Sequence, residues 1–209
     1  MLVIGLAATG TWAYMSDAEY STGNTITAGT LDLVPLTTGS YSGSGSLYHV
    51  TAGGNGVNGK VVFDSIAPGQ NGAFEWVLSD NGSLPGTLTI SYSNTFNDTG
   101  VSSLKTWMLA NGYSGDLANY LMVTLQKGVG ANQSAAEGAM TYILGSAGSP
   151  VALSNLAAVL NTQSQALTAL GGANTVVYKL SWSLSSTDPN VNVVQADSAQ
   201  LNLIFTLNQ

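Results

Sequence analysis

The stretch TLTISY, residues 87–92, decides the fold class because its side chains alternate strictly in character. Leu88, Ile90 and Tyr92 form one series, and a Thr or Ser stands at every position between them. Successive side chains leave a β-strand on opposite faces, so a period of two gives one apolar face and one polar face. The stretch therefore predicts a half-buried strand.

The same period of two predicts further strands on both sides of this stretch. It extends over residues 73–78, 176–184 and 201–207, each of them short and rich in β-branched or aromatic side chains. Asn81-Gly82 and Pro85-Gly86 supply turn residues before residues 87–92. Several short strands separated by turns indicate two packed sheets.

Residues 26–64 divide into two strands and a loop in this interpretation. Residues 26–36 alternate like a half-buried strand, and a further strand begins at Val61. The Gly-, Ser- and Thr-rich residues 37–59 between them predict a loop, with hairpin turns at Asn55-Gly56 and Asn58-Gly59.

The middle of the chain changes to a helical pattern. Residues 134–170 are rich in Ala and predict a helical insert, with Ser154 as a candidate cap. Its apolar residues at helical spacing are Leu153, Leu156, Val159 and Leu160. Residues 101–111 also show helical spacing, at Leu104, Trp107 and Met108. We therefore expect a mainly β protein: a jelly-roll β-sandwich over residues 16–209, with short helices inserted in its connections.

The first 15 residues, MLVIGLAATGTWAYM, carry no charge and alternate in size. Smaller side chains occupy the odd positions from 3 to 13. The even positions hold nearly all the bulky groups and form the candidate donor face: Leu2, Ile4, Leu6, Ala8, Trp12 and Tyr14. A terminal strand with one large apolar face can complete the sheet of a neighbouring molecule, so we interpret residues 1–15 as an extended donor strand.

Two alternatives for this stretch stay open, a secretory signal and a membrane anchor. It lacks the basic start of a signal, although Thr11-Trp12-Ala13 resembles a cleavage site. It is shorter than the roughly 20 apolar residues that cross a bilayer, and Asp17 and Glu19 follow it. We expect no membrane span in the mature chain.

The composition favours association of the chain with copies of itself over binding to nucleic acid. Only 7% of the 209 residues are charged, Arg is absent, and the net charge is −7. A phosphate backbone would find no basic stripe to bind. A surface with so little charge has little electrostatic repulsion to keep copies apart. Cys is also absent, so the chain forms neither disulfides nor thiolate metal sites.

A search for catalytic and metal-binding groups finds no convincing site. His49, the only histidine, lies in the predicted loop and lacks the partners that a catalytic triad or a zinc site requires. Asp188, Asn190, Asn192 and Asp197 could supply oxygen ligands to calcium, but they lack the spacing of an EF-hand loop. A polar turn is the favoured interpretation, and we expect no enzymatic activity, no cofactor and no metal site.

Two blocks of the sequence carry a family signature. The first joins GTWAYMSD, residues 10–17, to TITAGTLDL, residues 25–33. The second holds IAPG at 66–69, FEW at 74–76 and DNGSL at 80–84. Together they resemble the TasA and camelysin family of bacterial biofilm matrix proteins, and the chain looks closest to the archaeal bundling pilus subunits among such proteins.

The resemblance implies a jelly-roll subunit that polymerises head to tail by donor-strand complementation into an extracellular, cell-surface filament. Its partners would be identical subunits, with lateral contacts between filaments that support bundling and biofilm formation. The peptidase activity attached to the camelysin name is not carried over, because the chain lacks the groups that this chemistry needs. Candidate N-glycosylation sites at Asn81, Asn97 and Asn132 agree with secretion, although a chain rich in Asn, Ser and Thr also contains such sequons by chance.

The alternative from a different class is a secreted carbohydrate-binding or adhesive module. Jelly rolls host such functions as well as structural ones. Candidate platforms for stacking against sugar rings are Tyr41, Tyr48, Trp107 and Tyr113, although each of these rings could instead serve packing.

Overall fold

The computed structural model describes residues 33–35, 41–43, 46–53, 56–64, 66–97, 103–113, 115–168, 174–194 and 197–209. Side chains are described from residue 59 onward, apart from those of residues 64 and 189. The first predicted strand is therefore seen only from Leu33, and residues 26–32 lie outside the described part.

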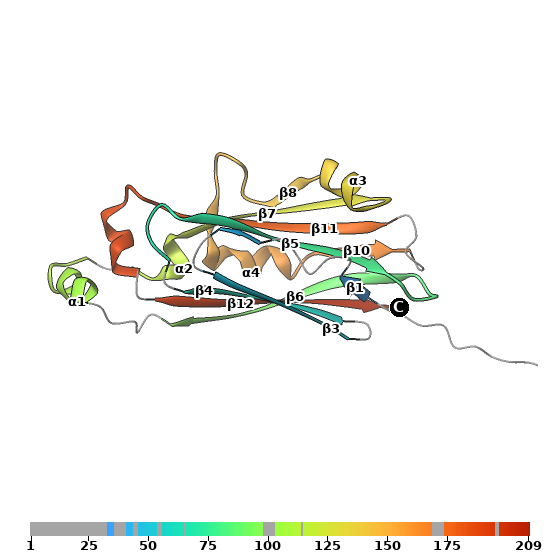
Figure 1. Ribbon diagram of the computed structural model, residues 1–209, viewed down its shortest axis with the longest axis horizontal. Helices are drawn as coiled ribbons and strands as arrows, with labels where there is room; N and C mark the ends of the chain where they lie inside the picture. The colour runs from blue at the N-terminus through green and yellow to red at the C-terminus, as the bar shows by residue number, and fades with distance from the viewer. Residues whose placement is uncertain are drawn as a thin grey trace, which may run out of the picture.

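Two antiparallel sheets lie one above the other (Figure 1). The first sheet has the order β1 (Leu33–Pro35), β5 (Asn71–Asp80), β11 (Thr175–Leu184), β7 (Leu121–Gly130) and β8 (Thr141–Leu144), with β2 (Tyr41–Gly43) also on β5 and β9 (Val151–Ala152) also on β7. The second sheet has the order β10 (Ser164–Leu167), β6 (Gly86–Asn97), β12 (Ser198–Asn208), β4 (Gly56–Asp64) and β3 (Ser46–Gly53). The mainly β class predicted from the alternation is confirmed.

The core lies between the sheets, where the alternating apolar side chains of both layers meet. Phe63 of β4 contacts Phe74 of β5 edge to face, with ring centroids 5.8 Å apart. Phe205 of β12 lies against two rings of the opposite sheet, 6.0 Å from Trp76 and 5.5 Å from Tyr178. All five rings are almost completely buried. Aromatic pairs in these geometries add to the free energy of burial, so they hold the two sheets in one register.

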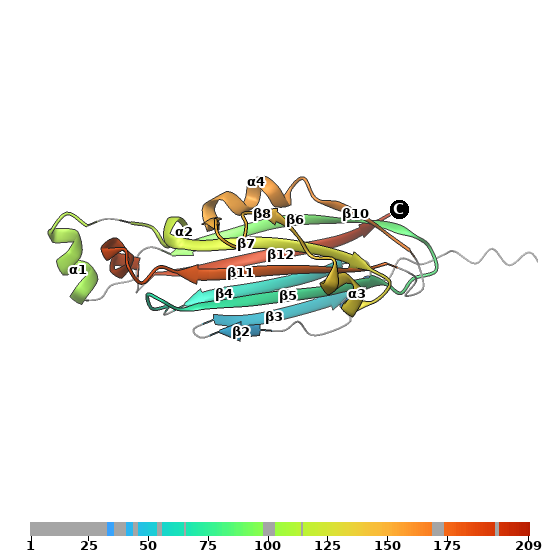
Figure 2. The ribbon, with the colours of Figure 1, turned by 90° about the horizontal axis from the view of Figure 1, so that it is seen from above.

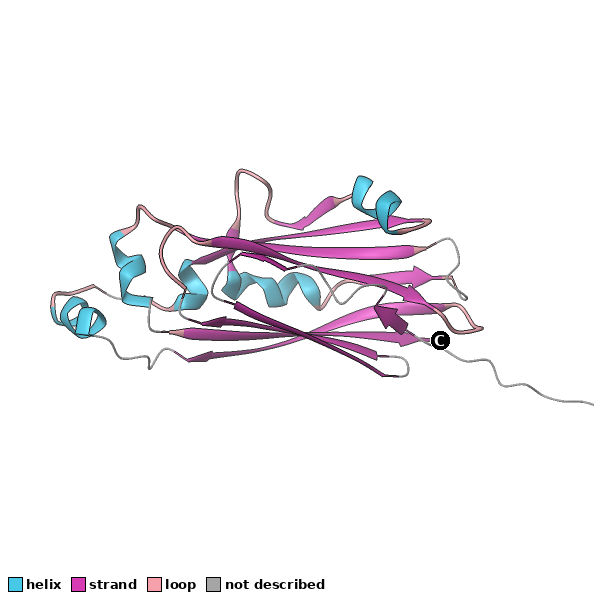
Figure 3. Ribbon diagram, viewed as in Figure 1, coloured by secondary structure: helices cyan, strands magenta, loops and turns pink. Residues whose placement is uncertain are grey.

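Short helices occupy the connections (Figure 3). They are α1 (Ser103–Ala110), α2 (Leu117–Tyr120), α3 (Gln133–Gly138), η1 (Leu153–Asn155), α4 (Leu156–Leu160) and η2 (Pro189–Val194). In the views of Figures 1 and 2, α4 lies beside β6 at one side of the sandwich, and the two elements pack together. It buries Leu156 and Leu160 there, which confirms the predicted helical face.

The helical insert predicted over residues 134–170 is only partly correct. Besides α3, η1 and α4, this region contains the three short strands β8, β9 and β10. Ser154 does not cap α4: it lies inside η1 and is exposed, and α4 begins after Asn155. The Ala-rich composition indicates helix, but pairing with β6 and β7 at the sheet edges stabilises strands in the same region.

The loop predicted for residues 37–59 is wrong. The structure places β2, β3 and the start of β4 there, and His49 lies in β3 opposite Lys60. A hairpin does reverse the chain between Gly53 and Gly56, as the first predicted turn requires. Gly and Ser disfavour strands in isolation, but cross-strand pairing decides the outcome here.

Gly59 explains why the second predicted turn is absent. It lies inside β4, where a Cβ atom would stand 2.1 Å from Nε1 of Trp76 on the opposite sheet. The glycine therefore leaves room for the indole ring and does not reverse the chain.

Replacing Gly59 with Ala should destabilise the protein, because the added methyl group collides with the indole of Trp76. Overpacking of this kind typically costs about 1–3 kcal/mol. Urea unfolding followed by tryptophan fluorescence measures the change. Gly148→Ala is the matched control, since a Cβ there meets no atom within 4 Å. Equal unfolding midpoints for the two variants would contradict this account of Gly59.

Candidate functional site

The predicted donor face lies outside the described residues, so it stays a prediction. It comprises Leu2, Ile4, Leu6, Ala8, Trp12 and Tyr14. A donor strand of this kind requires a sheet edge without a strand partner on the sandwich that receives it.

A backbone edge without a strand partner runs along the second half of β6, on the side where α4 packs. On one side, β12 pairs with β6 along residues 87–97. On the other side, β10 pairs only with residues 86–89. Among the described residues, no strand pairs with residues 90–97 on that outer side. Unpaired N–H and C=O groups of an edge strand are a template for pairing with another chain.

The inner face of β6 becomes partly exposed along this edge, although Tyr92 and Phe96 still pack against the core. Leu201 and Leu203 of β12 are 0% and 1% exposed. Their direct neighbours across the ladder, Asn94 and Tyr92 of β6, are exposed and half-buried respectively. Burial of the Tyr92 ring nevertheless raises its pKa to about 12, so its hydroxyl stays neutral at physiological pH. An added strand would therefore pair with the β6 backbone and place its own side chains beside the partly exposed inner face.

The three predicted glycosylation sites all lie on exposed residues. Asn81 is in the turn between β5 and β6, where the Gly82 N–H donates to Oδ1 of Asp80 at 2.8 Å. Asn97 ends β6. Asn132 has a structural role that sequence reasoning missed: its Oδ1 accepts a hydrogen bond from the Ala135 N–H at 2.9 Å and caps α3. Asn is a preferred N-cap residue, which could have indicated this helix start.

The acidic residues considered for calcium have protein partners. Asp188 Oδ1 accepts a hydrogen bond from the backbone N–H of Asn190 at 2.9 Å and starts η2. Asp197 forms a buried ion pair with Lys105 of α1. Across the described ranges, no group of three or more acidic, His or Cys side chains is placed to hold a metal ion. The segment is not the polar turn that the sequence favours: it forms the 3₁₀ helix η2, which buries Val191, Val193 and Val194.

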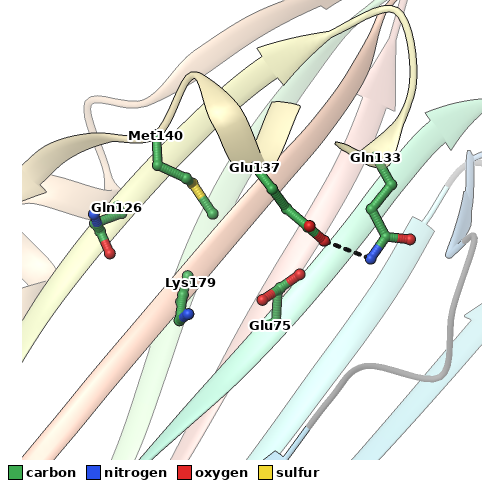
Figure 4. A pocket seen from close by; sticks show the side chains of 6 residues that line it. All are labelled: Glu75, Gln126, Gln133, Glu137, Met140 and Lys179. Carbon is green, nitrogen blue, oxygen red and sulfur yellow. Dashed lines mark hydrogen bonds between the residues drawn. The ribbon is translucent and has the colours of Figure 1, made fainter. Parts of the chain in front are cut away.

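A polar hollow of about 390 Å³ lies on the outer face of the first sheet, beneath α3 (Figure 4). Its lining residues are Glu75, Gln126, Gln133, Glu137, Met140 and Lys179. The Glu75 and Glu137 carboxyl groups point toward one another in Figure 4, and Gln133 Nε2 donates to Glu137 Oε1 at 2.6 Å. Partial burial raises the pKa of Glu75, and hydrogen bonding and repulsion from Glu137 raise it further, while Lys179 opposes the shift.

Glycine in β7 allows α3 to approach the sheet this closely. A Cβ atom on Gly128 would stand 1.9 Å from the carbonyl oxygen of Ala136. Val77, Val177 and Ala136 form a small buried cluster beneath the helix. The two glutamates therefore sit beside an apolar contact that holds them close together, which favours a shared proton.

Glu75→Gln should make the protein more stable at neutral pH. Since the folded state binds the Glu75 proton more tightly than the unfolded chain does, this group contributes its full stability below the ordinary glutamate pKa of 4.5. That contribution is lost as the pH rises through the higher pKa of the folded state. Urea unfolding at several pH values should show a gain for Glu75→Gln at pH 7 that shrinks near pH 4.

Asp116→Asn is the control for this pH dependence, because Asp116 is an exposed acid outside the hollow. A pH profile for Glu75→Gln that matches those of the parent protein and this control would contradict the paired-glutamate interpretation.

Comparison with known proteins adds no relative to these observations. No protein-family model matches the chain, and no curated protein matches it. Within the described part of the chain, no helix has the length and apolar character needed to cross a membrane.

Proposed function

We propose that the protein is a structural subunit of an extracellular, cell-surface filament that polymerises head to tail by donor-strand complementation. The open edge of β6 at residues 90–97 carries this proposal. In this account, residues 1–15 of one subunit add a strand to that edge in the next subunit. The chain then binds copies of itself, catalyses no reaction, and needs no cofactor.

The positions of the chain start and the open edge favour a filament over a closed dimer. β1, the first described element, pairs with the last residues of β5, at the end of the sandwich that carries the C-terminus (Figure 1). The open stretch of β6 runs toward the opposite end, where Asn97 pairs with Ser198. Donor and acceptor are therefore different surfaces, and such heterologous contacts repeat head to tail.

The contact would be strong enough to hold a fibre together. Five large donor side chains, at about 1.5–3 kcal/mol each, give on the order of 7–15 kcal/mol before the entropic cost of ordering. Each added backbone hydrogen bond contributes about 0.5–1.5 kcal/mol. The gross total is comparable with the stability of a whole domain, about 5–15 kcal/mol. The sandwich itself supports a jelly-roll subunit, and its weakly charged surface favours the lateral contacts that bundling and biofilm formation need.

Removal of residues 1–15 should abolish filaments, because the truncated chain keeps the acceptor edge and loses the donor. Every described contact lies within residues 33–209, so the truncation removes none of them. Negative-stain microscopy should show monomers, and the peptide LVIGLAATGTWAY, residues 2–14, should bind them with 1:1 stoichiometry by calorimetry. Filaments formed by the truncated protein would rule out this function.

A lysine at the inner face of the open edge should block strand addition. Asn94→Lys places a charge where the donor side chains would pack, whereas Thr95→Lys places it on the opposite face of the same strand, and both parent residues are exposed. We expect Asn94→Lys to weaken binding of the peptide by at least about tenfold, or ~1.4 kcal/mol. Thr95→Lys should leave the affinity unchanged. Equal effects of the two variants would place the acceptor elsewhere, for instance on the edge strand β3.

A further inference from the structure

The helix α1 presents three large apolar side chains to solvent at one end of the molecule. Leu104, Trp107 and Leu109 are 45%, 59% and 50% exposed. In Figures 1 and 2, α1 is the outermost element at the end opposite the C-terminus. Leu104 and Trp107, three positions apart, lie on one face of the helix. Leu109 lies on the other side of the buried Lys105 and Met108. Exposed apolar side chains that share a face mark an interaction site.

Buried contacts fix the orientation of this apolar face. Lys105 of α1 forms an ion pair with Asp197, which lies just before β12, and both side chains are buried. Met108 is 4% exposed, and α1 packs against η2. Because removing one partner of a buried ion pair is costly, this pair holds the helix in one position.

The exposed face is also electrically neutral, and its indole ring stacks on a second aromatic ring. Lys105 is the only charged residue of α1, and its ammonium group points inward to Asp197. The Trp107 ring stacks on Tyr113, with ring centroids 6.4 Å apart and an interplanar angle of 29°. A neutral, aromatic face of this kind suits an apolar protein surface, and the chain as a whole carries few charges that would repel a second copy.

The position of α1 identifies that second copy as the occupant. The helix follows β6 directly in the chain, so it lies at the end toward which the open edge runs. β1 begins at the opposite end of the sandwich, and a stretch of 32 residues before it would span at most about 100 Å at ~3.3 Å per residue. A neighbour whose N-terminal stretch enters the β6 edge from this end must pass α1.

We propose that the apolar face of α1, formed by Leu104 and Trp107, is the surface on which the next subunit seats in the filament. The inference rests on the proposed function and adds to it a second contact, separate from strand addition. Strand addition joins the subunits, and α1 buries apolar surface where their ends meet.

The test combines Leu104→Ser with Trp107→Ser in the full-length chain. We expect the critical concentration for assembly, measured by light scattering and sedimentation, to rise about tenfold or more, as for loss of an aromatic hot spot. Ile204→Ser, which removes an exposed apolar residue of β12, is the matched control and should leave assembly unchanged. Thermal unfolding of both variants should match that of the parent protein, because the replaced side chains are exposed.

Two further measurements separate this inference from the proposed function. In the truncated protein, the double variant should bind the peptide of residues 2–14 as tightly as the parent does. In parent filaments, oxidative footprinting should show Trp107 protected relative to the truncated monomer. Unchanged assembly and equal labelling of Trp107, with the peptide still bound, would overturn the α1 contact alone, whereas absence of peptide binding would overturn the proposed function. Protection of Trp107 by an added polysaccharide in the monomer, with assembly unchanged, would instead assign α1 to sugar binding.

Discussion

The arrangement depends on the aromatic contacts between the two sheets. Phe205 of β12 lies against Trp76 and Tyr178 of the opposite sheet, and Phe63 lies against Phe74 beside them. These rings fix which residues of each strand face inward. They also require Gly59, because the Trp76 indole occupies the space that any other side chain would fill. The inward face of β12, and through the ladder that of β6, follows from this packing.

The edge strands of this sandwich have backbone groups that no neighbouring strand of the same sheet can pair with. Each sheet ends in strands whose outer backbone groups need hydrogen-bond partners. The short strands β1, β2, β8, β9 and β10 cover parts of these edges, and α4 packs beside β6. Along residues 90–97 of β6 the described structure has no outer strand partner, and burial of the inner face falls from Ile90 to the exposed Asn94. An edge of this kind is a liability for a monomer and an advantage for a subunit that assembles.

Strict alternation made the long strands predictable from sequence. Residues 87–92, 176–184 and 201–207 all form strands, because burial of one face requires a period of two. The Gly- and Ser-rich residues 37–59 could not be predicted in this way, since β2 depends on pairing with residues 72–74 of β5 and Gly59 packs against the Trp76 ring of the opposite sheet. Spacing in the chain likewise gave no sign that Lys105 would reach Asp197, 92 positions away.

Of the candidate site, the sequence supplies the donor stretch and the structure supplies the edge that could receive it. Amide hydrogen exchange followed by mass spectrometry tests their match most directly, on the truncated protein with and without the peptide of residues 2–14. The account predicts that the peptide slows exchange at residues 90–97 of β6, because their outward N–H groups gain partners. Slower exchange confined to β3, or no change along β6, would contradict it.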